Sequence, residues 1–414
     1  MKDVFKAVKV TDKVYWVGAI DWAVRDFHGY LTNHGSTYNA YLILAEKVTL
    51  VDTVKAPFQS EMLARIASVV DPAKIEYVIS HHAEPDHSGA LPGLVAALKP
   101  QKVFASSLGV RTLEQHYHGA CPAVAVKDGE RLSLGDMELV FADTRMCHWP
   151  ESMVSYLPQE KLLISQDAFG MHLASYERFD DELDLQLLDR EAAKYFANIL
   201  MPFCGFITKT LDKLRAAGWQ FDMILPDHGP IWRKHSRRIL ESYARWASQP
   251  RGNKALLLYD TMWSSTELMA RAVGEGLAAG GATAKLLPMS GTHRSELATE
   301  LLDAGALVVG TPTLNNQIFP TLADPLIYIL GLAPKGLLAA SFGSYGWSGE
   351  AAKKVRALLE ELKAELVGEP LRAQFVPTGA DLKRCYELGL QVAARLREKL
   401  APATPGESTD PFAV

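Results

Sequence analysis

Hydrophobic positions in the first 250 residues form short runs separated by polar turns. YNAYLILAEKVTLVDT (38–53) is rich in β-branched and aromatic residues, with a turn at Glu46 and Lys47, and predicts two paired strands. IEYVIS (75–80) is a short apolar run that ends in a polar cluster, as in a buried strand entering a loop. ALPGLVAAL (90–98) predicts a helix. Further strands are expected at 103–105, 137–144, 152–157, 161–167 and 223–227, and helices near 190–217 and 235–247.

The pattern changes after SQPRGNK (248–254), where Pro250, Gly252 and Asn253 interrupt the helical periodicity. Strands then alternate with helices, and this βαβ pattern predicts a parallel sheet with helices on both faces. We therefore expect two domains, about 1–250 and 254–400, and a loose Pro-, Ser- and Thr-rich tail at 401–414. The segments predicted in the second domain are strands at 255–260, 282–289, 306–313 and 336–343, and a glycine-ended helix at 265–281.

Composition fits this picture of an ordinary globular protein. Of 414 residues, 48% are hydrophobic and 22% charged, which excludes a disordered chain, a collagen-like repeat and a disulfide-dense mini-protein. The net charge of −5, without a long run of one sign, argues against binding to nucleic acid or to an anionic membrane. No apolar run approaches the roughly 18 residues that span a bilayer.

Localisation is predicted from the chain start and the cysteines. MKDVFKAVKVTDKVYW lacks the apolar stretch and small-residue cleavage site of a signal peptide. The four cysteines (Cys121, Cys147, Cys204 and Cys385) lie far apart and form no C-x-x-C pair. We therefore expect reduced thiols in a cytoplasmic protein, without a built-in rubredoxin or zinc ribbon.

A cluster of metal-ligand residue types follows the predicted strand 75–80. HHAEPDHS (81–88) places His82, Glu84, Asp86 and His87 within six residues of one loop. Imidazoles and carboxylates packed this closely repel or compete unless a cation organises them. The alternative is a polar surface loop, but such a cluster is improbable by chance in a chain with 12 histidines among 414 residues.

Three later strands also end in residues of this kind. His148 follows the strand 137–144, Asp167 ends KLLISQD, and His228 ends MILPDH. Each alone would more often be a capping or hydrogen-bonded residue than a ligand. Their repeated position at strand ends predicts a shared metal site.

The motif H-x-[HE]-x-D-H after a strand, followed by a lone His, Asp and His, resembles the metallo-β-lactamase fold. Its hydrolases usually have H-x-H-x-D-H, whereas this chain has Glu84 at the second His position. The more anionic ligand set suits iron better than zinc. The match is therefore closest to the flavodiiron proteins, also called A-type flavoproteins. The segment RDFHGYLTNHGSTYNAYLI (25–43) of this chain also resembles the amino-terminal stretch of that family.

This resemblance implies a diiron centre and its ligands. One iron would be bound by His82, Glu84 and His148, the other by Asp86, His87 and His228, with Asp167 bridging them. His28 and Tyr195 would lie near the irons as proton donors, with an ordinary structural role as the alternative.

The second domain carries a candidate flavin site. YDTMWSST (259–266) links a strand to a helix, and hydroxyls and free amides at a helix N-terminus suit a phosphate group. A plain helix cap is the alternative. No Walker A motif occurs, and Gly274-x-Gly276 does not complete G-x-G-x-x-G, so a nucleotide triphosphate or dinucleotide site is unsupported.

This loop resembles the flavodoxin phosphate loop, with Ser264 in place of its usual glycine. GTPTLNNQIFP (310–320) and SFGSYGWSGEA (341–351) match the flavodoxin loops that flank the flavin ring, and Trp347 can stack on a flat ring. We therefore expect FMN. Its candidate contacts are Thr261, Met262, Trp263, Ser264, Ser265, Thr266, Pro312, Thr313, Leu314, Asn315, Gly343, Ser344, Tyr345, Gly346 and Trp347.

The resemblance extends over residues 1 to about 400 and implies an αβ/βα sandwich followed by a flavodoxin-like doubly wound sheet. It implies reduction of dioxygen to water, of nitric oxide to nitrous oxide, or of both, with electrons passing from an external donor through FMN to the irons. The donor would be a separate rubredoxin, or alternatively a coenzyme F420-type hydride donor. Two alternative functions are a dizinc hydrolase with an appended flavodoxin domain and a pure electron carrier.

Assembly is expected to bring the cofactors together. The short linker SQPRGNK has little reach for folding one domain onto the other. The family's solution is a head-to-tail homodimer, or a dimer of such dimers, in which the FMN of one chain lies beside the irons of its partner. An isologous interface of this kind closes after two chains.

Overall fold

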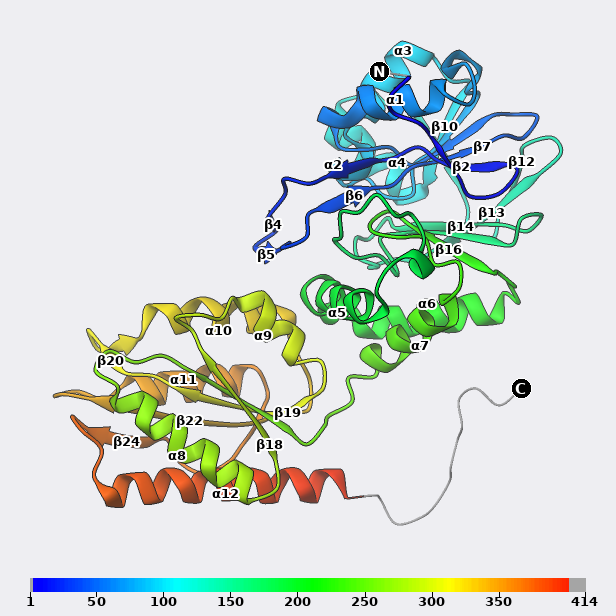
Figure 1. Ribbon diagram of the computed structural model, residues 1–414. Coiled ribbons are helices and arrows are strands. Elements are labelled where there is room, and N and C mark those ends of the chain that lie inside the picture. The colour runs from blue at the N-terminus through cyan, green and yellow to red at the C-terminus, as the bar shows by residue number, and fades with distance from the viewer. Residues whose placement is uncertain (1–2, 402–414) are drawn as a thin grey trace. The chain divides into compact units, whose positions relative to one another are not determined.

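The computed structural model describes residues 3–401, and the chain divides into two compact units, Met1–Ser248 and Gln249–Val414. Figure 1 shows the two units along the chain, with the boundary in the segment that follows α7 (Ser236–Ala247). Apart from Ala401, the predicted tail lies outside the described residues. Within residues 3–401, no helix is both long and apolar enough to cross a membrane. All four cysteines are buried and outside any disulfide.

Two packed sheets form the first unit. The larger sheet has the order β1-β2-β7-β8-β9-β10-β11 and the smaller sheet β12-β13-β14-β15-β16. The larger sheet comprises β1 (Val8–Lys9), β2 (Val14–Trp16), β7 (Tyr41–Ile43), β8 (Thr49–Val51), β9 (Tyr77–Ile79), β10 (Lys102–Ser106) and β11 (Ala123–Val126). The smaller comprises β12 (Arg131–Ser133), β13 (Glu138–Asp143), β14 (Met153–Leu157), β15 (Leu162–Gln166) and β16 (Met223–Pro226). Two short hairpins pair β3 (Ala19–Asp21) with β6 (Ser36–Tyr38) and β4 (Asp26–Phe27) with β5 (Tyr30–Leu31).

Helices cover the outer faces of these sheets. The α-helices are α1 (Gln59–Ala67), α2 (Pro85–Ser88), α3 (Leu91–Leu98), α4 (Ser107–Tyr117), α5 (Leu185–Tyr195), α6 (Cys204–Ala216) and α7. Shorter turns are η1 (Ala56–Phe58), η2 (Pro72–Lys74), η3 (Asp180–Glu182), the π-helical η4 (Phe196–Leu200) and η5 (Met201–Phe203). One apolar core lies between the two sheets, and a second packs the larger sheet against α1, α3 and α4. With α5, α6 and α7 beside the smaller sheet, this is the predicted αβ/βα sandwich (Figure 1).

The second unit is a parallel sheet with the order β18-β17-β19-β22-β23, in which β24 also pairs with β22. Its first four strands follow the 2-1-3-4 order of flavodoxin-like folds. The strands are β17 (Lys254–Tyr259), β18 (Thr283–Pro288), β19 (Ala304–Gly310), β22 (Leu338–Tyr345), β23 (Glu365–Leu366) and β24 (Leu371–Gln374), with a small hairpin of β20 (Thr313–Leu314) and β21 (Gln317–Ile318). The helices are α8 (Ser265–Ala279), α9 (Arg294–Glu300), α10 (Pro320–Leu332), α11 (Ala351–Glu361) and α12 (Gly379–Leu400).

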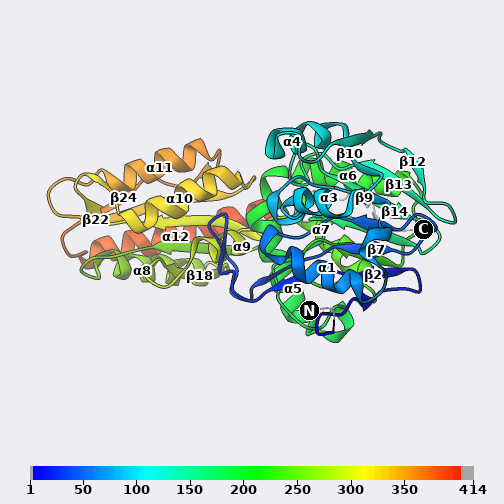
Figure 2. The same cartoon turned by 90° about the horizontal axis from the view of Figure 1, so that it is seen from above.

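Helices lie on both faces of this sheet, as predicted. Figures 1 and 2 show α8 and α12 side by side on one face and α10 and α11 on the other. A Cβ added at Gly276 would lie 2.0 Å from the carbonyl oxygen of Tyr386 on α12. Gly276 therefore serves close helix packing.

The principal predicted strands and helices are confirmed, with corrections of extent. The helical region predicted at 190–217 is confirmed and is divided, because the π-turn η4 and the short helix η5, which contains Pro202, separate α5 from α6. The strand predicted at 306–313 ends at Gly310, because Pro312 lacks the N–H that would continue the ladder. The strand predicted at 336–343 extends instead to Tyr345.

Candidate metal centre and flavin site

The strand ends of the first unit bring the seven predicted ligands together. His82 and Glu84 lie on the loop after β9, and Asp86 and His87 lie on α2, which begins at Pro85. His148 lies on the loop between β13 and β14, and Asp167 directly follows β15. His228 comes soon after β16. Both sheets therefore contribute ligand-type side chains to one end of the sandwich.

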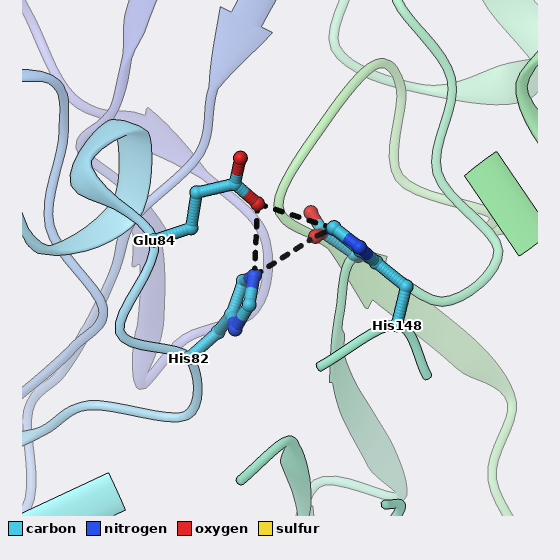
Figure 3. A group of neighbouring side chains, drawn as sticks. His82, Glu84 and His148 are labelled. Carbon is cyan, nitrogen blue, oxygen red and sulfur yellow. Dashed lines mark hydrogen bonds and ion pairs between the residues drawn. The ribbon is translucent and has the colours of Figure 1, made fainter. Parts of the chain in front are cut away.

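The first ligand group consists of His82, Glu84, His148 and Asp167. Glu84 Oε2 lies 3.1 Å from both His82 Nε2 and His148 Nε2, and His148 Nε2 lies 3.1 Å from Asp167 Oδ2. In Figure 3 the three labelled side chains converge from two loops on a common point. Ligand atoms each about 2.0–2.2 Å from one metal ion are separated by such distances.

The second ligand group consists of Asp86, His87 and His228, facing the other oxygen of Asp167. Asp86 Oδ2 lies 3.3 Å from His87 Nε2 and 3.2 Å from His228 Nε2. Asp167 Oδ1 lies 3.0 Å from His87 Nε2 and 3.4 Å from His228 Nε2. Asp167 thus presents one carboxylate oxygen to each group, as a bridging ligand would.

The electrostatics of the site favour cations. Burial alone would lower the pKa of His82, but its contacts with Glu151 and Glu84 outweigh burial and raise that pKa to about 10. Burial opposes ionisation of Asp167 as well, yet His87 and His148 hold the pKa of its carboxyl well below the usual range. Both oxygens of Asp86, both ring nitrogens of His87 and Asp167 Oδ1 are buried and have no hydrogen-bond partner within residues 3–401. Such an arrangement fits metal ions, because buried polar atoms otherwise find partners.

Hydrogen bonds on the side of the ring away from the ligand group fix the orientation of two candidate ligand imidazoles. His82 Nδ1 donates to Glu151 Oε1 over 2.9 Å, and His228 Nδ1 donates to the carbonyl oxygen of Thr37 over 2.6 Å. Such contacts select the tautomer that turns Nε2 toward a metal.

The flavin loops of the second unit lie at the carboxyl ends of parallel strands, where doubly wound sheets bind ligands. A pocket of about 490 Å³ opens there, within the size range of small-molecule sites. Trp263 and Trp347 are 89% and 91% exposed at its edge. The lining residues are Met262, Trp263, Ser265, Pro312, Thr313, Leu314, Asn315, Asn316, Ser344, Tyr345, Gly346, Trp347, Ser348, Phe375 and Val376.

The phosphate loop fits an anionic group. Thr261 Oγ1 is buried beside the N-terminus of the fifteen-residue helix α8 and has no hydrogen-bond partner in the described part of the chain. Ser264, just before that helix, has a φ of 60°, the left-handed conformation that favours glycine. This conformation agrees with the glycine expected there from the flavodoxin resemblance.

Both units of the chain are similar to known proteins. Residues 37–229 match the ODP family beta lactamase, and residues 257–389 match flavodoxin. The nitric oxide reductase of Moorella thermoacetica is 46% identical over 395 residues, which cover 94% of this chain and 99% of that protein. The structure of rubredoxin oxygen:oxidoreductase from Desulfovibrio gigas is 44% identical, with a TM-score of 0.94 over 96% of this chain and all of that one.

A flavodiiron protein of Giardia intestinalis is also similar, with 34% identity and a TM-score of 0.91 over 96% of this chain and 99% of that one. This chain belongs to the flavodiiron family. It is an oxidoreductase of the flavodiiron type, with a metallo-β-lactamase-like unit followed by a flavodoxin-like unit.

The remaining residues predicted for this flavodiiron protein lie at or near the two sites. His28 Nε2 contacts Glu84 Oε1 at 2.6 Å, and its side chain is half exposed. Tyr195 is buried, and its ring lies 6.1 Å from that of His228. Four predicted flavin residues do not line the pocket: Thr261, Ser264, Thr266 and Gly343. The Thr266 hydroxyl on α8 bonds that of Ser344 on β22. A Cβ at Gly343 would lie 2.1 Å from the Thr311 carbonyl oxygen, so no side chain fits at that position.

Sequence reasoning missed several residues of this flavodiiron protein. Asn316, Ser348, Phe375 and Val376 line the flavin pocket. Phe375 and Val376 follow β24, so a carboxyl-end argument applied to that short strand could have found them. Glu151 and the buried Asp227 stand behind ligand imidazoles. Asp227 directly precedes His228 and Glu151 lies three residues after His148, but nothing in the sequence indicates what either contacts.

Proposed function

We propose that this flavodiiron protein holds two iron ions in its first unit. The ligands would be His82, Glu84 and His148 for one iron, Asp86, His87 and His228 for the other, and Asp167 between them. The single observation that carries this proposal is the position of Asp167, whose two oxygens face different groups at 3.0–3.5 Å. Two divalent cations would more than balance the charge of the three buried carboxylates among these ligands.

Iron is favoured over zinc by the ligand chemistry. Glu84 adds a third carboxylate oxygen donor where the related hydrolases usually have an imidazole, and carboxylates suit harder ions. The flavodoxin-like unit favours redox chemistry as well. Two zinc ions together with thioester or phosphodiester hydrolysis would contradict this assignment and favour the hydrolase.

FMN is the flavin that the second unit would bind. The unpartnered Thr261 hydroxyl and the α8 N-terminus suit its phosphate, and the open pocket with Trp263 and Trp347 suits its ring. An aromatic surface of this kind can cover a flat ring while leaving its edge accessible to a donor.

The proposed reaction is reduction of dioxygen to water, of nitric oxide to nitrous oxide, or of both, with rubredoxin or another external donor supplying electrons. The names of the two relatives, a nitric oxide reductase and a rubredoxin oxygen:oxidoreductase, support these substrates and this donor. When bound, FMN and the two irons would supply the electron transfer. The protein's part is to hold the ligands in a buried site, with His28 Nε2 at Glu84 as a route for protons from solvent.

The decisive experiment starts with protein purified without oxygen and loaded with ferrous iron and FMN. We expect two irons and one FMN per chain. Reduced protein should consume dioxygen or nitric oxide in separate anaerobic electrode assays, and reduced rubredoxin should sustain turnover. Full cofactor loading without consumption of either gas would contradict the proposed reaction.

Assembly as a head-to-tail homodimer, or as a dimer of such dimers, completes the proposal. In that arrangement the FMN of one chain would serve the irons of its partner. Mass measurement of the loaded protein should therefore give a dimer or tetramer, and a fully active monomer would contradict it.

A further inference from the structure

The two ligand groups differ in what stands behind their imidazoles. His82 faces the first group through Nε2, and its Nδ1 donates to the Glu151 carboxylate at 2.9 Å. In the second group, His228 Nδ1 donates to the neutral carbonyl of Thr37. His87 Nδ1 has no hydrogen-bond partner among the described residues, and Asp227 Oδ2 lies 3.5 Å from it. A hydrogen bond from an imidazole to a carboxylate is therefore found behind His82 but not behind His87 or His228.

Glu151 is fixed in this position from several sides. Its side chain is buried, with the residue 3% exposed, and Oε1 also accepts from the backbone N–H of Ala83 at 3.2 Å. The backbone carbonyl of Glu151 accepts from the Ser106 hydroxyl at 2.7 Å. Since one carboxylate oxygen accepts both N–H groups, it cannot turn away from His82 without leaving buried donors unpaired.

Glu151 also connects the two segments that supply the first group. It lies three residues after His148 on the loop between β13 and β14, and it bonds to His82 and Ala83 on the loop after β9. The same carboxylate thus sets the ring orientation of His82 and joins its loop to that of His148.

We propose that Glu151 is a positioning residue that makes the two iron positions unequal. This inference rests on the diiron centre proposed above. The Glu151 carboxylate makes His82 a stronger electron donor to its iron than His87 or His228 is to the other. The His82–Glu84–His148 position therefore favours ferric iron more than the Asp86–His87–His228 position does. A carboxylate behind a ligating imidazole raises the basicity of that ligand. A charged acceptor is also a stronger partner than a neutral carbonyl.

The test is Glu151→Gln in the full chain loaded anaerobically with iron and FMN. Gln keeps the size of the side chain and an acceptor oxygen but removes the charge. Because outer partners of this kind typically contribute 10–100-fold to metal affinity, one of the two irons should pass to a chelator about 10–100-fold more readily. The ferric form should lose more affinity than the ferrous form, and each tenfold difference between the two losses raises the reduction potential by about 59 mV.

Two further variants distinguish the loss of the Glu151 charge from a general disturbance of the first unit. Asp180→Asn removes another buried carboxylate of the first unit, one that accepts from His235 Nδ1 at 2.8 Å and touches no candidate ligand. It should leave both irons and their potentials at wild-type values. Glu151→Asp keeps the charge with a shorter reach, so a smaller rise in potential is expected, and this variant serves as the test if Glu151→Gln fails to fold.

The outcomes distinguish this inference from the diiron proposal. Two irons in the wild type, with wild-type potentials and iron release in a folded Glu151→Gln protein, would overturn the role of Glu151 alone. Wild-type potentials in a folded Glu151→Asp protein would do the same if the Gln variant does not fold. A wild-type protein that binds no iron at all, or binds two zinc ions, would instead overturn the diiron centre itself.

Discussion

The side chains of the candidate metal ligands are at most 12% exposed, whereas Trp263 and Trp347 at the flavin pocket are 89% and 91% exposed. The candidate metal centre is assembled from charged groups that contact one another at strand ends. The flavin pocket is assembled from neutral loops with an apolar edge. Buried charges must be paired, while an exposed aromatic costs little until a ligand covers it. Loss of a group should therefore disrupt the metal centre much more than the flavin pocket.

The largest effect is expected at the carboxylate shared by both ligand groups. Asp167→Ala should lose iron and all gas reduction but retain FMN, because two like-charged cations would be left without a common anion. Iron and FMN are measured per chain on the same preparation. Asp189→Ala, an exposed carboxylate of the first unit paired with Arg238, is the control and should keep both. Normal iron content in Asp167→Ala would refute the bridging role.

A second experiment asks whether the two sites cooperate across chains. Asp167→Ala is mixed, without added flavin, with a Thr266→Ala/Trp347→Ala double mutant from which FMN has been removed beforehand. In a head-to-tail dimer, each hybrid has flavin from one chain facing irons from the other. Random mixing makes about half of the dimers hybrids with one working pair of two, so about a quarter of wild-type activity should return.

The controls for this mixing experiment are the two variants alone, which should be inactive. Mass measurement must show that hybrids have formed. An inactive mixture that contains hybrids would contradict transfer between chains and favour transfer within one chain.

A smaller effect is expected at the flavin ring. Trp347→Ala should weaken FMN binding by about 1–3 kcal/mol, as for an aromatic that stacks on a base. Iron content should not change, because the candidate ligands belong to the other unit. FMN affinity is measured by fluorescence titration of flavin-free protein. Trp22→Ala, a half-exposed tryptophan of the first unit, is the control, and equal affinities in the two variants would return Trp347 to an ordinary surface role.

The sequence predicted the features that depend on neighbouring residues in the chain. His82 to His87 are contiguous, and His148, Asp167 and His228 follow recognisable strands, so strand ends alone indicated one shared site. The division of the helical region 190–217 by the π-turn at Phe196–Leu200 was not predicted, although Pro202 lies just after that turn. Strands of two or three residues such as β4 and β5 are too short to show an alternating pattern.

Contacts between segments far apart in the chain could not be predicted from the sequence. Glu151 bonds to His82 across 69 positions, and no periodicity reports such a pairing. Phe375 and Val376 were missed because LRAQ (371–374) is short and polar and did not predict the strand that carries them to the pocket. Residues such as Glu151, Phe375 and Val376 were therefore harder to identify than the candidate ligands themselves.

The smallest effect is expected at Ser264, where the flavin unit departs from the family's usual glycine. Its φ of 60° costs an L-residue about 1–2 kcal/mol, but glycine also loses more conformational entropy on folding. Ser264→Gly should therefore stabilise the FMN-free protein by less than about 1 kcal/mol, measured by denaturant unfolding that follows the second unit. Ser265→Gly, one position later at the first residue of α8, should instead destabilise it, by less than the roughly 0.5–1 kcal/mol that glycine costs in the middle of a helix. If Ser264→Gly destabilises the protein as Ser265→Gly does, the serine makes an interaction that offsets its strain, and the phosphate loop is better adapted to serine than to glycine.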